Sequence, residues 1–204
     1  MSLLKNYCST VDLENYLHID IDAGGADFAI NGAVSIIEKL TGRVFKSDEV
    51  ASIRYFDGDG SRELMIDDCV EITKVELGLN TYGDSREEIP ATGLTGYIKQ
   101  PFNNSAVERP ITSILLRDRR WIVGNGNHAI TAKWGYFTAV PADIKLSAII
   151  LSAGIYLQGK NSNGSNGIKS ESIGNYSVSY DDPSGWEDYD KVMKILLNYK
   201  KYVI

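Results

Sequence analysis

Hydrophobic residues are almost continuous from 135 to 159, and the expected fold is organised around this stretch. A Pro-Ala-Asp start at 141–143 is typical of a helix N-terminus, where proline loses no hydrogen bond and an acid is favoured by the helix dipole. Gly159 is a natural helix stop. Between these ends only four residues are left to contact water, namely Lys145, Ser147, Ser152 and Gln158. A helix that is apolar all round must be covered by other elements, so we expect a central helix. It is too short, and too polar at its ends, to span a bilayer.

Two further helices are expected before it. Ser9 and Thr10 can cap a short helix with an apolar side. The Asp-Ala-Gly-Gly run at 22–25 predicts a break in the chain. A longer helix then follows from Ala26 to Leu40, ending near Gly42, and its apolar residues recur at helical spacing. This buried stripe consists of Ile30, Ala33, Val34, Ile37 and Leu40.

After Arg43 the pattern changes from helical to alternating, which is typical of strands. The first strand contains Ile53 and Tyr55, and it ends in an Asp-Gly-Asp-Gly turn at 57–60. Further strands are expected at Leu64 to Ile66, 70–78, 111–116, 120–123 and 128–134. Residues 81–96 read as a long surface loop, and 124–127 as a hairpin turn. Residues 50–138 are therefore expected to form an inserted antiparallel β subdomain, sandwich-like or barrel-like.

Beyond the central helix the chain becomes polar. Residues 160–167 predict a flexible loop. In the next segment, up to 182, Ile173, Tyr176, Val178 and Tyr180 favour an extended conformation, and Gly174 would allow a kink. Ser184 and Glu187 form a capping box for a last helix. The expected apolar stripe of that helix is Trp186, Tyr189, Met193, Leu196 and Leu197.

The fold class expected from these elements is α+β. A small helical bundle, from residues 1–49 and 139–204, would surround the central helix and carry a loop and extended arm at 159–182. The antiparallel β subdomain at 50–138 would be inserted into it. A chain of 204 residues is long enough for this arrangement.

The composition limits which cellular compartment and which binding partners we expect. The net charge of −6 and the pI near 5.0 argue against broad adhesion to duplex phosphates. They remain compatible with a collar past which DNA slides. Cys8 and Cys69 give neither a disulfide framework nor a zinc pattern, which favours a reducing compartment. The start of the chain has no charged region followed by a long apolar core, so we expect no secretion signal and a cytosolic site of synthesis.

Residues with catalytic chemistry are sparse. Four acids could suggest a calcium or magnesium loop, and a metal-dependent hydrolase using Asp57, Asp59, Asp67 and Asp68 is one alternative. The flanks alternate as strands, however, and turn chemistry alone explains the Asp-Gly-Asp-Gly run. His18 and His128 lie beside no nucleophile motif, and structural or surface roles are favoured for both. No phosphate-binding loop is present. We therefore expect no enzyme activity, no cofactor and no metal.

A short basic cluster lies at the end of the β region. Arg117, Arg119 and Arg120 stand beside Trp121 and could touch nucleic acid. Because Asp118 lies among them and the whole chain is acidic, a solvated strand edge is the favoured interpretation. Charges at such an edge also discourage pairing with other chains.

The segment from Lys169 to Tyr180 has a different character. Serine alternates with apolar and aromatic residues, so the segment is too polar for a core and too patterned for a linker. Such a segment can add a strand to a neighbouring chain. The alternative is an intramolecular strand on the β subdomain. The residues expected to contact a partner are Lys169, Ser170, Glu171, Ile173, Gly174, Tyr176, Val178 and Tyr180.

These features together resemble the head–tail connector proteins of tailed bacteriophages, also called head completion or adaptor proteins. The matching parts are Gly135-Tyr136, the helix start at 140–144, the 169–180 segment and the helix from Trp186. The N-terminal helices, with Leu13, Tyr16 and Leu17, are similar too. Small members of this family are nearly all helical. The β insert is therefore a departure, and its role is open.

The resemblance implies a non-enzymatic virion protein of the neck, made in the host cytoplasm. Such proteins form a ring, commonly dodecameric, docked under the portal protein and extending the channel toward the tail or stopper proteins. DNA would pass without specific binding, and no membrane would be involved. A ring interface is heterologous, so each subunit needs two unlike complementary faces. The alternative within the same class is another neck or tail-completion protein that uses the β insert for binding.

Overall fold

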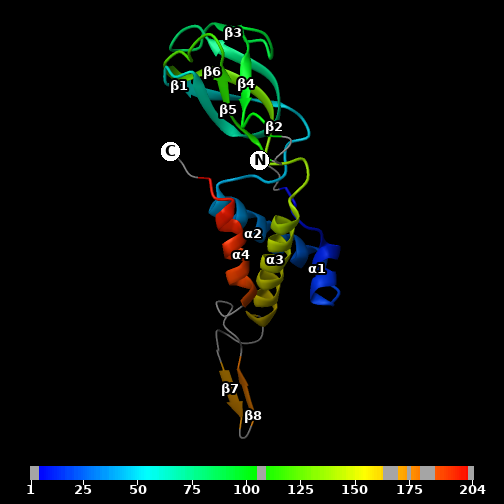
Figure 1. Cartoon of the computed structure of the whole chain (residues 1–204). Helices are drawn as coiled ribbons and strands as arrows, with labels where there is room; N and C mark the ends of the chain where they lie inside the picture. The colour runs from blue at the N-terminus through cyan, green and yellow to red at the C-terminus, as the bar shows by residue number, and fades with distance from the viewer. Residues whose placement is uncertain (1–4, 105–108, 163–169, 174–175, 180–186, 202–204) are drawn as a thin grey trace. The chain divides into compact units, whose positions relative to one another are not determined.

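The computed structural model describes residues 5–104, 109–162, 170–173, 176–179 and 187–201. It divides into two compact units, one formed by residues 1–43 and 140–204 and the other by 44–139. The first contains the helices and the second a six-stranded antiparallel sheet (Figure 1). The mixed α+β class is thereby confirmed. Each unit is described separately below.

The helical unit begins with α1 (Thr10–Leu17) and α2 (Ala23–Thr41). Ser9 caps α1 in a full capping box with Asp12, as a serine before an apolar stripe predicts. The expected break at 22–25 is wrong, because α2 already begins at Ala23. Asp22 is its N-cap and accepts a hydrogen bond from the Gly25 N–H (2.7 Å), so the two glycines form the first turn. Gly42, in the left-handed conformation, ends the helix.

The third helix, α3 (Ala142–Ser162), packs against each of the other helices of its unit. It continues past Gly159, so the expected stop there is wrong and the helix includes the start of the expected loop. Residues 163–169 lie outside the described part. Two serines expected to contact water, Ser147 and Ser152, are fully buried. Each hydroxyl donates to the carbonyl four residues earlier, at 2.8 and 2.7 Å, which satisfies it inside the core.

The last helix, α4 (Glu187–Asn198), buries Leu196 as expected but only part of the rest of the expected stripe. Val192 and Leu196 are buried, whereas Tyr189 and Leu197 are exposed. Residues four apart lie on one helix face, so the buried stripe runs through 192 and 196. The expected capping residue Ser184 and Trp186 lie outside the described residues. After α4 the chain is tied to the end of α2, since the Lys201 N–H donates to the Thr41 carbonyl (2.7 Å).

The β unit is one antiparallel sheet in the order β1-β6-β2-β5-β4, with β3 also paired to β2. Its core contains two fully buried tryptophans, Trp121 and Trp134, among branched aliphatic residues. The strands are β1 (Ser52–Gly58), β2 (Glu63–Gly78), β3 (Arg86–Glu88), β4 (Tyr97–Gln100), β5 (Ile111–Leu116) and β6 (Gly124–Trp134).

Several expected strands differ from those observed. The strands expected at 64–66 and 70–78 are one strand, β2, whose ladder contains register shifts between Met65 and Cys69 and again near 70 and 73. Bulges of this kind let a long strand bend and change partner, here from β5 to β6. The first strand does not pair with the strand that follows it, because β1 lies beside β6.

Three further segments of the β unit differ from the expectation. The expected loop at 81–96 contains β3, and β4 was not expected. The 120–123 segment is not a strand, because its Trp121 enters the core and donates to the Ile114 carbonyl (3.3 Å). The residues expected to form a hairpin turn at 124–127 begin β6, where Gly124 pairs with Gly58. The side-chain oxygen of Asn127 accepts from the Gly58 N–H (3.2 Å), which draws this segment into the sheet.

The two remaining strands, β7 (Ser170–Ile173) and β8 (Tyr176–Ser179), form a separate two-stranded antiparallel sheet. None of the described helices is both long enough and apolar enough to cross a membrane.

Candidate interaction sites

The segment expected to contact a partner forms the β7–β8 hairpin. Its backbone register places Ser170 opposite Ser179 and Ser172 opposite Ser177, whereas Glu171 is opposite Val178 and Ile173 opposite Tyr176. Lys169, Gly174 and Tyr180 lie outside the described residues.

The alternative to a partner contact, an intramolecular strand on the β subdomain, is not formed among the described residues, since β7 and β8 pair with each other and with no strand of the six-stranded sheet. A two-stranded sheet on its own is at best marginally stable in water.

The four acids of the hydrolase alternative do not assemble into a metal site. Asp57 accepts from the Gly126 N–H (2.5 Å), and Asp59 accepts from the Ser61 N–H (2.8 Å) as in an ordinary turn. Asp67 pairs with Arg54 (2.7 Å), and Asp68 is buried. Within the described ranges, no group of three or more histidine, cysteine or acidic side chains is placed to hold a metal ion.

The two histidines lie in different units. His18 is exposed at the end of α1, in the left-handed conformation that ends the helix. His128 is fully buried in the β unit, where its Nδ1 accepts from the Gly78 N–H (3.0 Å). Its Nε2 is 3.0 Å from the Ile122 carbonyl, to which it must donate. Burial lowers the pKa of His128, and the nearby charge of Arg86 adds to this effect. Both ring nitrogens are hydrogen-bonded, so His128 ties the end of β2 to the segment that precedes β6.

The basic cluster at 117–120 is engaged within the β unit. Arg119 forms ion pairs with Glu87 (2.9 Å) and Asp118 (3.3 Å), and Arg120 donates to the Gly60 carbonyl (3.3 Å). Trp121 is fully buried, so it offers no ring for base stacking. The cluster is charged and mostly exposed, as expected, but it lies in the connection between β5 and β6, so the expected strand edge is wrong.

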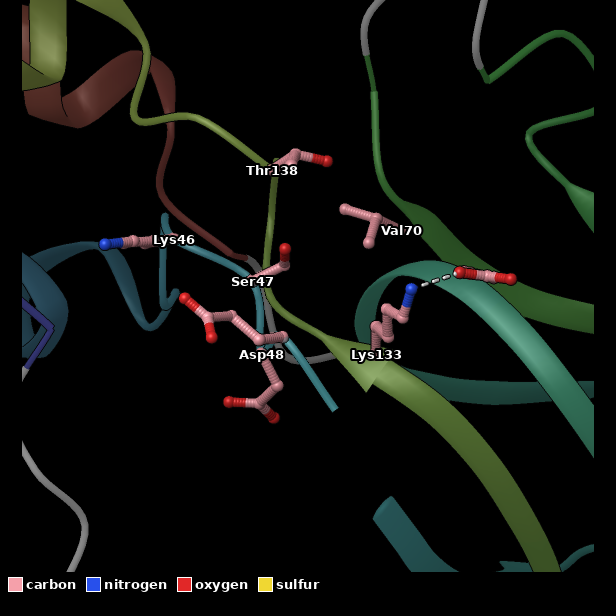
Figure 2. A pocket seen from close by; sticks show the side chains of 8 residues that line it. Lys46, Ser47, Asp48, Val70, Lys133 and Thr138 are labelled. Carbon is pink, nitrogen blue, oxygen red and sulfur yellow. Dashed lines mark ion pairs between the residues drawn. The ribbon is translucent and has the colours of Figure 1, made fainter. Parts of the chain in front are cut away.

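A pocket of about 510 Å³ lies in the β unit (Figure 2). Lys133 and Glu71 form an ion pair on its wall (2.8 Å), which holds the pKa of Glu71 below its usual value. The eight lining residues are Lys46, Ser47, Asp48, Glu49, Val70, Glu71, Lys133 and Thr138. These residues carry mixed charge.

The sequence did not predict that the helical unit has exposed apolar side chains on its surface. Several large apolar side chains on α2 and α3 face outward, among them Phe28 and Leu146, which are 75% and 46% exposed. The sequence did contain a sign of this, because the central helix is apolar on all sides. The three other described helices of the unit do not enclose it completely.

Comparison with known proteins defines the class of fold. No family model and no curated protein matches the sequence. Solved structures do match over the whole chain. One is a chain from the neck of an empty GTA particle computed with C6 symmetry, with a TM-score of 0.59 and 10% identity, covering 100% of this chain and 95% of that one. Another is a chain from the neck of a native GTA particle computed with C12 symmetry, with a TM-score of 0.53 and 12% identity. This match covers 100% of the present chain and 94% of the neck chain.

The protein therefore has the fold of a chain found in the necks of such particles. The likeness includes the helices and the β unit together, because it extends over all of the present chain. The β insert, which departs from the small helical connectors, is thus shared with these neck structures.

Proposed function

We propose that this protein is a non-enzymatic structural component of the neck of a tailed phage or phage-like particle. Copies of it form a ring, dodecameric in the assembled particle, between the portal protein and the tail or stopper proteins. The observation that carries the proposal is the fold likeness to GTA neck chains, which covers 100% of this chain and 94–95% of those chains. The symmetries of those necks agree with a ring built from identical subunits.

Two properties of the chain support this role. Its net charge of −6 suits a collar through which DNA moves without being held. In addition, the β7–β8 hairpin is a two-stranded sheet that pairs with no other described strand. In the proposed role this hairpin contacts a neighbouring subunit or the portal, and the contact stabilises it.

The hairpin assignment is tested by deleting residues 170–180 in a particle-producing strain. The variant protein is expected to remain folded, because β7 and β8 pair with no strand of the six-stranded sheet, but no longer to join particles. Circular dichroism measures folding, and immunoblotting of purified particles measures incorporation. Leu94→Ser is the matched control, since this loop residue of the β unit is 88% exposed. Infectious particles of normal composition made with the deletion variant would refute the assignment.

A second neck protein class, one that completes the tail instead of the head, would have the same overall chemistry. Position in the particle separates the two. Labelling the N-terminus with a gold-binding tag should place the label beside the portal vertex in DNA-filled heads that lack tails. A label found only on free tails would favour the alternative.

A further inference from the structure

Strand β1 lies at one edge of the six-stranded sheet and pairs only with β6 (Figure 1). Its first residues are exposed on both faces of the sheet, since side chains alternate between the faces. Ile53 and Tyr55 on one face are 53% and 59% exposed, and Ser52 and Arg54 on the other face are exposed as well. The opposite edge strand, β4, is shorter and is buried or half-buried throughout. This part of β1 is therefore held in the sheet mainly by its ladder with β6.

The outer backbone edge of β1 is open at Ile53 and Tyr55. Ile53 is opposite Thr131 of β6, and the Thr131 carbonyl accepts from the Thr73 hydroxyl of β2 (3.1 Å), so it points away from β1. Opposite residues in an antiparallel ladder point their backbone groups either toward each other or both away. The N–H and C=O of Ile53 therefore point outward, and so do those of Tyr55, two residues further on. An added strand uses open groups at this spacing.

One cation lies beside this open edge. The Arg86 guanidinium lies over the ring of Tyr55, 5.1 Å from its centroid, and its Nε donates to the Asn127 carbonyl (3.1 Å). Within the part of the chain that the structure describes, Arg86 forms no ion pair with an acid. A strand added to β1 would therefore meet a branched aliphatic side chain, an aromatic ring and a positive charge. This combination favours an acidic strand.

The β7–β8 hairpin has the complementary properties. Among the described strands, β7 and β8 pair with each other alone, so the hairpin has strand edges available for pairing. Residues 170–182 contain three acids and no base, and one of these acids, Glu171, belongs to β7. Pairing with a larger sheet would also stabilise a two-stranded sheet that is marginal by itself.

A second copy of β1 is a poorer occupant of the same edge. The antiparallel register that uses both open residues pairs Ile53 of one copy with Tyr55 of the other. It also places Arg54 directly opposite Arg54 of the other copy, and like charges at opposite positions destabilise a sheet. Charge thus favours the hairpin over β1 as the added strand.

We propose that β1 of one copy binds β7 of a neighbouring copy as an added strand, with Glu171 near Arg86. The six-stranded sheet of one copy is then extended by the hairpin of the next. This inference rests on the proposed function for its biological setting and adds the surface that receives the hairpin. Because the two contacting surfaces differ, the contact is heterologous and can repeat from copy to copy around a ring.

The test joins two copies through cysteines added to the full chain. Ile53→Cys labels β1, Ser172→Cys labels β7, and the two variants are mixed with a short bis-maleimide at about 100 µM, which populates micromolar contacts. The native thiols are buried, so the added thiols react first. Peptide mass spectrometry identifies the joined residues. Leu94→Cys mixed with Ser172→Cys is the matched control, because Leu94 is 88% exposed on a loop of the same unit.

The 53–172 product is expected in about tenfold higher yield than the 94–172 product. Adding Arg86→Glu to the Ile53→Cys chain should lower the 53–172 yield about threefold, because it brings like charges together. Adding Glu171→Arg to the other chain as well should restore the yield. Restoration by exchanging the two charges requires that both groups act across one contact, which a merely structural role would not produce. Circular dichroism checks that each variant remains folded.

Four results would overturn the inference. They are equal yields of the 53–172 and 94–172 products, a yield that Arg86→Glu leaves unchanged, a loss that Glu171→Arg does not restore, and a dominant 53–53 product, which would mean that β1 pairs with itself. A chain carrying both cysteines should remain largely unlinked at high dilution. A high yield of the 53–172 link within single chains would show that the hairpin binds its own sheet, and this too would overturn the inference.

Failure of the proposed function is distinguishable, because it is read from particles. If the 53–172 product forms with its charge dependence but the protein is absent from particle necks, the inference stands and the neck assignment falls. If the protein occupies necks and the product does not form, the reverse holds.

Discussion

At the scale of single residues, protonation of His128 makes the stability of the β unit depend on pH. Its Nδ1 accepts from the Gly78 N–H, and a protonated ring has no acceptor for that bond. The pKa of His128 is lowered in the folded protein from its ordinary value of 6.5, mainly by burial. The stabilising contribution of the neutral ring is therefore complete above about pH 6.5. It is lost as the pH falls below this value, since the unfolded chain binds the proton first.

Urea unfolding at a series of pH values checks this expectation. Between pH 7.5 and 5.5 the free energy of unfolding should fall with a slope of at most about 1.4 kcal/mol per pH unit from this one group. The variant His128→Gln keeps a hydrogen-bonding side chain without titration, so its slope should be smaller than that of the wild-type protein. Equal slopes for the two proteins would mean that His128 is protonated as easily when folded as when unfolded.

The two cysteines also have a predicted behaviour. Both are buried free thiols, and burial raises the pKa of Cys69 to about 12 and that of Cys8 above its usual value. Because the thiolate is the reactive form, both should react very slowly with a disulfide reagent at pH 8 and at once in guanidinium chloride. Leu94→Cys provides an exposed thiol as a positive control. Fast reaction of two thiols in the native wild-type protein would contradict the described burial.

Residue types alone could not predict some of the burial. Ser147 and Ser152 look like water-facing positions, yet both lie in the core, because in a helix a hydroxyl can bond to the carbonyl one turn earlier. Leu146 looks like a core residue and is exposed. Which side of a uniformly apolar helix is covered depends on the positions of its neighbours, and the sequence pattern does not contain that information.

At the scale of elements, the N-terminal helix is a direct case of sequence determining structure. The Ser9 hydroxyl accepts from the Asp12 N–H (3.1 Å), and the Asp12 carboxylate accepts from the Ser9 N–H (2.9 Å). Asp12 also pairs with Lys145 of α3 (2.8 Å), and this contact holds the pKa of Asp12 below its usual value. The cap thus orders α1 and supports its contact with the central helix.

Removing the cap should destabilise the helical unit measurably. Ser9→Ala is expected to lower the free energy of unfolding by about 1 kcal/mol, because a first-turn N–H loses its partner. Ser9→Asp, which retains an acceptor at the same position, should lower it by clearly less. Urea denaturation followed by circular dichroism gives both values. An alanine variant as stable as the wild-type protein would show that α1 does not depend on this cap.

Other elements were only partly predictable. Alternation correctly indicated strands near 53–57, 64–78, 111–116 and 128–134, but it did not show that β2 is continuous or that β1 lies beside β6. Strand order depends on contacts between distant parts of the chain. The start of α2 at Ala23 was missed because two glycines suggest a break, whereas the Asp22 cap makes them a first turn.

At the scale of the whole molecule, the α+β class followed from the change of period along the chain, and the neck resemblance followed from the order of a few segments. The fold likeness to GTA neck chains agrees with that resemblance at 10–12% identity, although no family model and no curated protein matches the sequence. The interaction surfaces were less predictable. The pairing of β7 with β8 required coordinates. So did the outward apolar side chains of α2 and α3, because their exposure depends on which residues the fold leaves uncovered.

In the proposed function, this protein acts as a ring in the neck of a particle. A cryo-electron microscopy reconstruction of the neck, from particles that carry this protein with an added C-terminal tag, is the decisive experiment. We expect one closed ring of this chain between portal and tail, with the symmetry of the C12 neck to which its fold is similar. A neck without the tagged chain, in particles that are nevertheless complete and infectious, would contradict it.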